Sequence, residues 1–300
     1  MFSCGYGDDF RDDIRCDSEI NGGDVDINMK DIKEKVKEGY GKIAQQGGNC
    51  GCKSSCCGGS RLAQDISKTV GYTETDMKAV PAGANLGLGC GNPVAIASLK
   101  EGEVVLDLGS GAGFDAFLAS PRVGKSGRVI GVDMTPGMIE KARVNARSGN
   151  YLNVEFRLGE IEKLPVEDNS IDVIISNCVI NLSPEKQKVF QESFRVLKPG
   201  GRLMVSDLVL VKELPAAIKG SIEAYVGCLS GAVKKDEYLA FIKEAGFQGI
   251  EVVGESHYPI AAMANDATAK AVIKDLSIED AQLSDIEDAV VSVKIHAVKP

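Results

Sequence analysis

The sequence predicts an α/β protein in which a mostly parallel β-sheet carries helices on both faces. Short apolar segments, typical of buried strands, alternate with amphipathic helical segments from residue 103 to residue 298. This alternation builds a parallel sheet with right-handed crossovers. A glycine-rich loop joins the first of these strands to a helix, and a hydrophobic content of 44% is enough for a full core.

Composition excludes several classes of function. No apolar run is long enough to span a bilayer, and the acidic N-terminus lacks the apolar segment of a secretory signal. A formal net charge of −9 disfavours nucleic acid or an anionic membrane as a partner. We therefore expect a cytoplasmic protein whose nine cysteines are mostly reduced thiols.

The N-terminal part, residues 1–80, is expected to form a tail, helices and a cysteine-rich loop. Residues 31–44 have helical apolar spacing, and 61–80 predict a helix, a break at Gly71 and a short second helix. Between them lies "NCGCKSSCCGG" (49–59), which is too rich in glycine and serine for a regular element.

The second part, residues 81–300, contains the predicted sheet. A helix should begin at Thr135 and Pro136 and end near Arg147, and another should run from Ser183 to Leu197 and stop at "KPGG". An insert with helical stretches, 257–289, precedes the last strand. Strands are expected at 103–109, 128–133, 154–159, 171–177, 202–209, 249–256 and 290–298, and further helices at 216–228 and 235–245.

The loop "DLGSGAGFD" (107–115) predicts a nucleotide-type cofactor. A dinucleotide site requires G-x-G-x-x-G, but Phe114 occupies the position of the last glycine. The spacing resembles instead the loop of S-adenosylmethionine (SAM) methyltransferases, although a glycine-rich turn of another nucleotide fold is the alternative. Asp133 ends the second strand, where a carboxylate can accept both ribose hydroxyls. The candidate cofactor-binding residues are Asp107, Gly109, Ser110, Gly111, Gly113, Asp133, Met134, Glu160, Ile161 and Asn177.

Three cysteines lie where a ligand of such a sheet would bind. Cys178 directly follows the strand 171–177, Cys228 follows the fifth strand, and Cys90 lies between glycines ahead of the first strand. Ligands of open α/β sheets bind beyond the carboxyl ends of the strands, so these thiols can converge near the cofactor. The alternative is that each is a small buried hydrophobic residue.

The motifs "GANLGLGCGNP", "DLGSGAGFD", "SNCVINLSPEKQ" and "YVGCLSGAV" resemble those of the arsenite methyltransferases, and the resemblance covers 36–256. It implies a Rossmann-like class I SAM methyltransferase fold with a seven-stranded sheet and an antiparallel last strand. It also implies that Cys90, Cys178 and Cys228 hold As(III). A fourth cysteine of the loop takes part, and the choice among Cys50, Cys52, Cys56 and Cys57 stays open, with spacing favouring Cys57 or Cys56.

This chemistry suits the residues present. As(III) is soft and prefers thiolates, and its lone pair can attack the methyl group without a general base. The chain has only two histidines, and neither lies in a motif. Each transfer formally oxidises arsenic, so a thiol pair reset by thioredoxin or glutathione would return it to As(III). Tyr40 could contact the sulfonium by a cation–π interaction or only pack its helix.

The sequence therefore predicts an enzyme that methylates arsenite or methylarsenite in arsenic detoxification. One alternative is a SAM-dependent carbon methyltransferase for a quinone or sterol, which would give the three cysteines no role. Another is a non-catalytic metalloid-binding protein. The cysteine loop itself could bind zinc or an iron–sulfur cluster, but its spacing does not match the usual zinc motifs.

Overall fold

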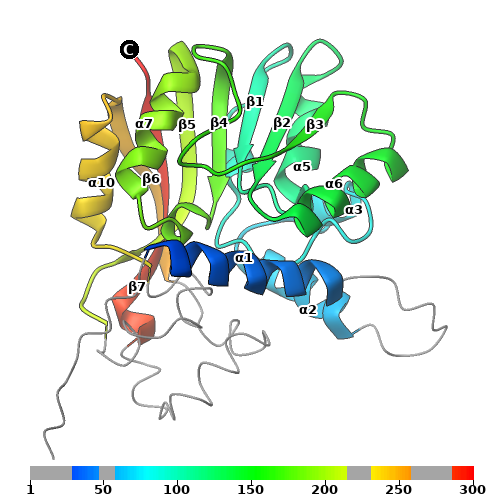
Figure 1. Ribbon diagram of the computed structural model, residues 1–300, viewed down its shortest axis with the longest axis horizontal. Coiled ribbons are helices and arrows are strands. Elements are labelled where there is room, and N and C mark those ends of the chain that lie inside the picture. Colours follow the sequence, from blue (N-terminus) through cyan, green and yellow to red (C-terminus); the bar gives the residue numbers. More distant parts are fainter. Residues whose placement is uncertain (1–28, 47–57, 215–230, 258–285) are drawn as a thin grey trace, which may run out of the picture.

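The computed structural model describes residues 29–46, 58–214, 231–257 and 286–300. Its centre is a seven-stranded sheet in the order β3-β2-β1-β4-β5-β7-β6, shown in Figure 1. Only β7 runs against its neighbours, since it pairs antiparallel with both β5 and β6. The predicted seven strands and antiparallel last strand are thus confirmed. The strands are β1 Val104–Leu108, β2 Arg128–Asp133, β3 Val154–Leu158, β4 Ile171–Asn177, β5 Leu197–Leu210, β6 Gln248–His257 and β7 Val290–Val298.

Helices cover both faces of this sheet, as the alternation of elements predicts. One face packs against α4, α5 and α6 through a core that includes Val94, Phe117 and Ile139. The opposite face packs against α7 and α10 through Phe190 and Tyr238. The described helices are α1 Met29–Gln46, α2 Gly58–Thr69, α3 Glu74–Lys78, α4 Pro93–Ile96, α5 Phe114–Val123, α6 Pro136–Ser148, η1 Ile180–Leu182, α7 Lys186–Val196 and α10 Lys235–Glu244.

Three boundaries differ clearly from the sequence prediction. Helix α2 begins at Gly58, so Gly58 and Gly59 are helical although the stretch 49–59 was expected to form no regular element. The fifth strand begins at Leu197, where "KPGG" was expected to be a helix-ending loop, because Leu197 already pairs with Ile171 across a register shift. The backbone N–H of Gly200 then donates to Lys299 O at 2.8 Å. The preceding helix begins only at Lys186, since the 3₁₀ turn η1 comes first and Ser183 is extended. The predicted helix at 216–228, the loop 49–57 and residues 258–285 of the insert lie outside the described residues.

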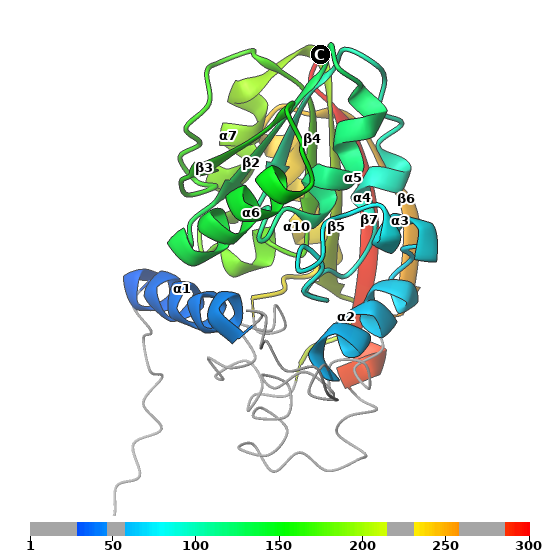
Figure 2. The same ribbon diagram turned by 90° about the vertical axis from the view of Figure 1, so that its right-hand side faces the viewer.

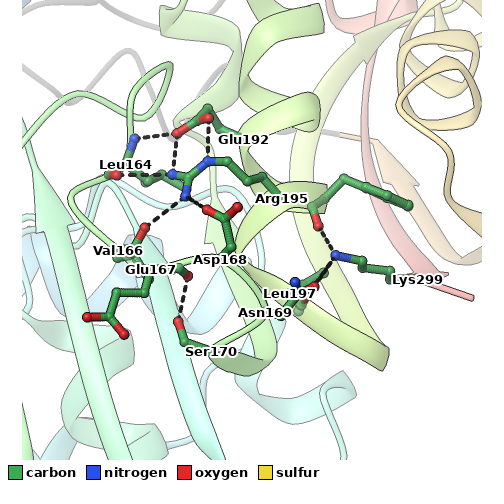
Figure 3. A network of polar contacts seen from close by, with 11 residues as sticks. Leu164, Val166, Glu167, Asp168, Asn169, Ser170, Glu192, Arg195, Leu197 and Lys299 are labelled. Carbon is green, nitrogen blue, oxygen red and sulfur yellow. Dashed lines mark hydrogen bonds and ion pairs between the residues drawn. The ribbon is translucent and has the colours of Figure 1, made fainter.

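A polar network joins α7 to the loop before β4 and to the end of the chain (Figure 3). Arg195 donates to the carbonyls of Leu164 and Val166 and pairs with Asp168 and Glu192. In the same network, Lys299 Nζ donates to Asn169 Oδ1, Phe194 O and Leu197 O, each at 2.7 Å. These contacts fix the sheet at the amino ends of β4 and β5.

The other end of the sheet faces the N-terminal helices. In both views, α1 and α2 lie beyond the carboxyl ends of the strands, away from the C-terminus (Figures 1 and 2). Lys33 of α1 pairs with Glu160, Glu162 and Glu185, which follow β3 and β4. Among the described helices, none has the length and apolar character needed to cross a membrane. The division into 1–80 and 81–300 stays a prediction.

Candidate active site

The glycine loop after β1 has a backbone that only glycine adopts easily. Gly109, Gly111 and Gly113 all have positive φ, at 63°, 52° and 96°. A β-carbon on Gly109 would lie 2.2 Å from Val179 Cγ2. No atom lies within 4 Å of the corresponding position at Gly111. The loop is therefore packed on one side and open at Gly111, as a loop that cradles a ligand must be.

A pocket lies between this loop, the carboxyl ends of β1, β2 and β4, and α1. Tyr40 and Val36 of α1 also line the pocket, and the choice between a cation–π contact and helix packing for Tyr40 stays open. Gly113, by contrast, does not line the pocket, and neither does Glu160, whose side chain is exposed and paired with Lys33. The expected cofactor residues that do line it are Asp107, Gly109, Ser110, Gly111, Asp133, Met134, Ile161 and Asn177.

Sequence reasoning missed several polar residues of the pocket, among them Tyr72, Asp115 and Glu162. Tyr72 donates its hydroxyl to Asp115 at 2.6 Å, and both are buried. Glu162 is buried as well and accepts a hydrogen bond from Ser183. Asp115 ends the glycine motif itself, and that position beside the loop is the only signal that could have identified any of the three.

The pocket is acidic. Burial raises the pKa of Asp107 well above its usual range, and the neighbouring charges of Asp115 and Asp133 raise it further. Burial also raises the pKa of Asp115 to about 6, against hydrogen bonds from Tyr72 and Asn177 that lower it. Within the described part of the chain, Asp107 Oδ2 has no hydrogen-bond partner. Buried carboxylates without a cation favour a positively charged ligand, and SAM carries both a sulfonium and an ammonium group.

Asp133 is held at the end of β2 by two backbone hydrogen bonds, and its contact with a ribose stays a prediction. Its Oδ2 accepts from the backbone N–H of Gly111 at 3.0 Å, and its Oδ1 accepts from that of Thr135 at 2.8 Å. Burial raises the pKa of this carboxyl too. The residues present therefore fit SAM.

Two of the three predicted thiols come together beside this pocket. The sulfur atoms of Cys90 and Cys178 and a carboxylate oxygen of Asp207 all lie within 4.8 Å of one another, and all three residues are buried. Cys178 also lines the pocket. One carbonyl fixes both cysteines, because Ser206 O accepts from Cys178 N at 2.8 Å and from Cys90 Sγ at 3.5 Å.

Asp207 of β5, the third member of this group, was also missed from the sequence. Its Oδ1 accepts from Asn181 at 2.9 Å and its Oδ2 from the hydroxyl of Tyr238 at 3.0 Å. Burial raises its pKa to about 6, although hydrogen bonds from Leu208 and Tyr238 act in the opposite direction. An acidic residue inside an otherwise apolar strand segment, "LMVSDLVL", was the available signal.

The remaining predicted cysteines, Cys228, Cys56 and Cys57, lie outside the described residues, as do Cys50 and Cys52. Their part in the site stays a prediction.

The sheet order, the glycine loop after β1 and the carboxylate at the end of β2 define a class I SAM-dependent methyltransferase. A family model described as a methyltransferase domain matches residues 99–246. The chain is also 30% identical to a crystallised arsenic(III) SAM methyltransferase of Chlamydomonas reinhardtii. That match has a TM-score of 0.57 and covers 80% of this chain and 73% of the other.

Two curated relatives are more similar in sequence. The arsenite methyltransferase of Halobacterium salinarum is 48% identical over 237 residues, which are 76% of this chain and 60% of that protein. The human arsenite methyltransferase is 41% identical over 168 residues, which are 53% and 44% of the two chains. The chain belongs to the arsenite methyltransferase family, and it spans about 60% of the length of the Halobacterium relative.

Proposed function

We propose that this protein methylates trivalent arsenic, as arsenite or methylarsenite, with SAM as the methyl donor. The observation that supports this most directly is the thiol pair. Cys90 and Cys178 come from distant segments, yet their sulfur atoms lie within 4.8 Å of each other, and Cys178 lines the pocket of the glycine loop. Soft thiolates select soft, three-coordinate As(III).

In this proposal, Cys90 and Cys178 bind arsenic with Cys228 as the third ligand. Three sulfur ligands leave the arsenic lone pair free to form the new As–C bond. Holding both reactants in one pocket makes the transfer effectively unimolecular, which can lower a barrier by about 7–11 kcal/mol. No proton has to be removed from arsenic, so the site needs no general base.

When bound, SAM supplies an electrophilic methyl group on a sulfonium. The residues proposed to hold it do three things: the glycines allow close approach, Asp133 accepts from the ribose, and Asp107 and Asp115 attract the positive charge. Ile161 and the buried Glu162 form the part of the pocket wall that we assign to the adenine ring. The proposed set is Asp107, Gly109, Ser110, Gly111, Asp133, Met134, Ile161 and Asn177, with Asp115 and Glu162 added. Gly113 and Glu160, the other two residues that the sequence suggested, do not line the pocket.

The reducing step is assigned to the cysteine loop. Each transfer leaves arsenic formally oxidised by two electrons, which a thiol pair can return as it forms a disulfide. Cys56 or Cys57 is the proposed member of this pair, and thioredoxin or glutathione the reductant that restores it. The biological role would be arsenic detoxification in the cytoplasm.

A direct assay tests the proposal. Purified, reduced protein given SAM, arsenite and a thiol should form methylarsenicals and consume SAM in proportion. Absence of any methylated product would refute it. Methyl transfer from SAM to a quinone or sterol that persists after Cys90→Ser and Cys178→Ser would support a carbon methyltransferase instead. Binding of arsenite without binding of SAM would identify a metalloid-binding protein.

A further inference from the structure

Asn177, the last residue of β4, holds the backbone on both sides of Cys90. Its Oδ1 accepts from Cys90 N at 3.0 Å and from Gly91 N at 3.2 Å. Its Nδ2 donates to Gly91 O at 2.9 Å. A carboxamide has one accepting oxygen and one donating nitrogen, and here both bind the same short segment. A single side chain thus fixes the position and the direction of this peptide.

The same side chain reaches the acidic wall of the cofactor pocket. Asn177 Nδ2 lies 2.8 Å from the hydroxyl of Tyr72 and 3.0 Å from Asp115 Oδ2. Since Tyr72 in turn donates to Asp115, the three side chains form a closed group. Asn177 therefore connects the segment that carries a thiol with the wall that would face the methyl donor.

The two glycines beside Cys90 are needed for this close packing. A β-carbon on Gly89 would lie 2.5 Å from Asn177 Nδ2, and one on Gly91 would lie 1.7 Å from Ser206 Oγ. Neither glycine has a positive φ, so the reason for glycine is contact and not backbone conformation. The segment is held between Asn177 on one side and Ser206 on the other, and Ser206 O also accepts from the Cys90 thiol.

We propose that Asn177 is a positioning residue that sets the distance from the Cys90 thiol to the Cys178 thiol. This inference rests on the proposed function, in which the thiols of Cys90 and Cys178 bind the same arsenic atom. Cys178 is the next residue in the chain, so Asn177 fixes one cysteine through the backbone and the other through its carboxamide. Without the carboxamide, the Cys90 thiol is still present, but its position relative to the Cys178 thiol is no longer fixed.

The first test compares Asn177→Ala with Asn153→Ala. Asn153 is also partly buried and bonds to Ser120 and Gly124, away from the site, so it matches the loss of a bonded asparagine. Binding of arsenite is measured by thiolate–arsenic absorbance in a parent chain whose four loop cysteines are serine. Kinetics are measured in the native chain. Asn177→Ala should raise the arsenite dissociation constant and KM at least about tenfold, which corresponds to one hydrogen-bonded contact. Asn153→Ala should leave both unchanged.

A second pair of variants perturbs the segment without touching the pocket. Gly91 does not line the pocket. Gly91→Ala forces the segment off Ser206 and should weaken arsenite binding while the SAM dissociation constant, measured by calorimetry, changes less than twofold. Adding Ser206→Gly removes the clashing side chain and should restore arsenite affinity. A purely structural role would lower the melting temperature without this selective loss and rescue.

The outcomes separate the two proposals. If the parent chain does not bind arsenite at all, the proposed function fails and this inference fails with it. If the parent binds arsenite and Asn177→Ala or Gly91→Ala binds it equally well, only the positioning role is refuted.

Discussion

Cys178 has a left-handed backbone, with φ at 57°, which is uncommon for a residue that has a β-carbon. Such a conformation costs about 1–3 kcal/mol and persists only where the surrounding structure holds it, and it is often found at functional sites. Here the hydrogen bond from its N–H to Ser206 O holds it. The chain turns sharply at the end of β4, and this turn brings the thiol to Cys90 and into the pocket.

At the same scale, the proposed role of the buried Asp115 carboxyl predicts that SAM binding depends on pH. Its pKa of about 6 lies above the usual value because the group is buried. Below that pH the carboxyl is neutral and no longer attracts a cation, so affinity should fall as the pH falls. Between pH 7 and pH 5 we expect the SAM dissociation constant, measured by calorimetry, to rise about tenfold.

Asp115→Asn should bind SAM weakly at both pH values and show a flat profile. The exposed Asp65→Asn is the control and should keep the wild-type profile. An Asp115→Asn profile as steep as that of the wild type would assign the effect to another group.

Among the elements, α1 closes the outer side of the pocket through Lys33. Burial lowers the pKa of the Lys33 ammonium, but hydrogen bonds to Glu162 and Glu160 outweigh burial and raise it well above its ordinary value. Glu162 is only 5% exposed, so it depends on this cation. The ion pairs join the N-terminal helix to the segments after β3 and β4.

Lys33→Met should therefore loosen α1. We expect the free energy of unfolding to fall by about 1–3 kcal/mol, because a buried carboxylate loses its partner. SAM should also bind more weakly, since Val36 and Tyr40 of α1 line the pocket.

The control for this change is Lys68→Met, which breaks an exposed pair with Glu74 and should change the free energy of unfolding much less, because water screens a pair at the surface. If urea unfolding shows that the free energy of unfolding falls equally in the two variants, the role given to Lys33 is contradicted.

Most of the helices and strands, but only part of the site, could be predicted from the sequence. Helical apolar spacing predicted α1, the Thr135–Pro136 start predicted α6, and short apolar segments predicted the seven strands. They did not predict the early start of β5 at Leu197, which depends on pairing with Ile171. For the site, motif position identified Cys90 and Cys178, whereas Asp207 and Glu162 matter only through burial in the folded chain. A local pattern can mark an unusual residue, such as the acidic Asp207 in an apolar strand, but it does not show which residues that side chain meets in the folded chain.

In the molecule as a whole, the contacts that stabilise the fold and the residues of the site lie at opposite ends of the strands. The network of Arg195 and Lys299 lies at the amino ends of β4 and β5 (Figure 3), and the thiols and pocket lie at the carboxyl ends. This division follows from the parallel sheet, because the loops that bind ligands all follow the carboxyl ends of the strands. The contacts at the amino ends of the strands therefore stabilise the fold without taking part in ligand binding.

Lys299→Met tests this separation. Three acceptors would lose their buried donor, so the free energy of unfolding should fall by about 1–3 kcal/mol. Dissociation constants for SAM and arsenite should stay within about twofold of the wild type, which is less than 0.5 kcal/mol. A large loss of ligand affinity in folded protein would show that the two ends are coupled.

The central claim is that Cys90 and Cys178 share one arsenic atom. X-ray absorption at the arsenic edge, on reduced full-length chain whose four loop cysteines are serine, counts the sulfur ligands directly. The account predicts at least two sulfur neighbours with one equivalent of arsenite, and one fewer in Cys90→Ser and in Cys178→Ser. Arsenic surrounded only by oxygen, or a sulfur count that neither substitution changes, would contradict it.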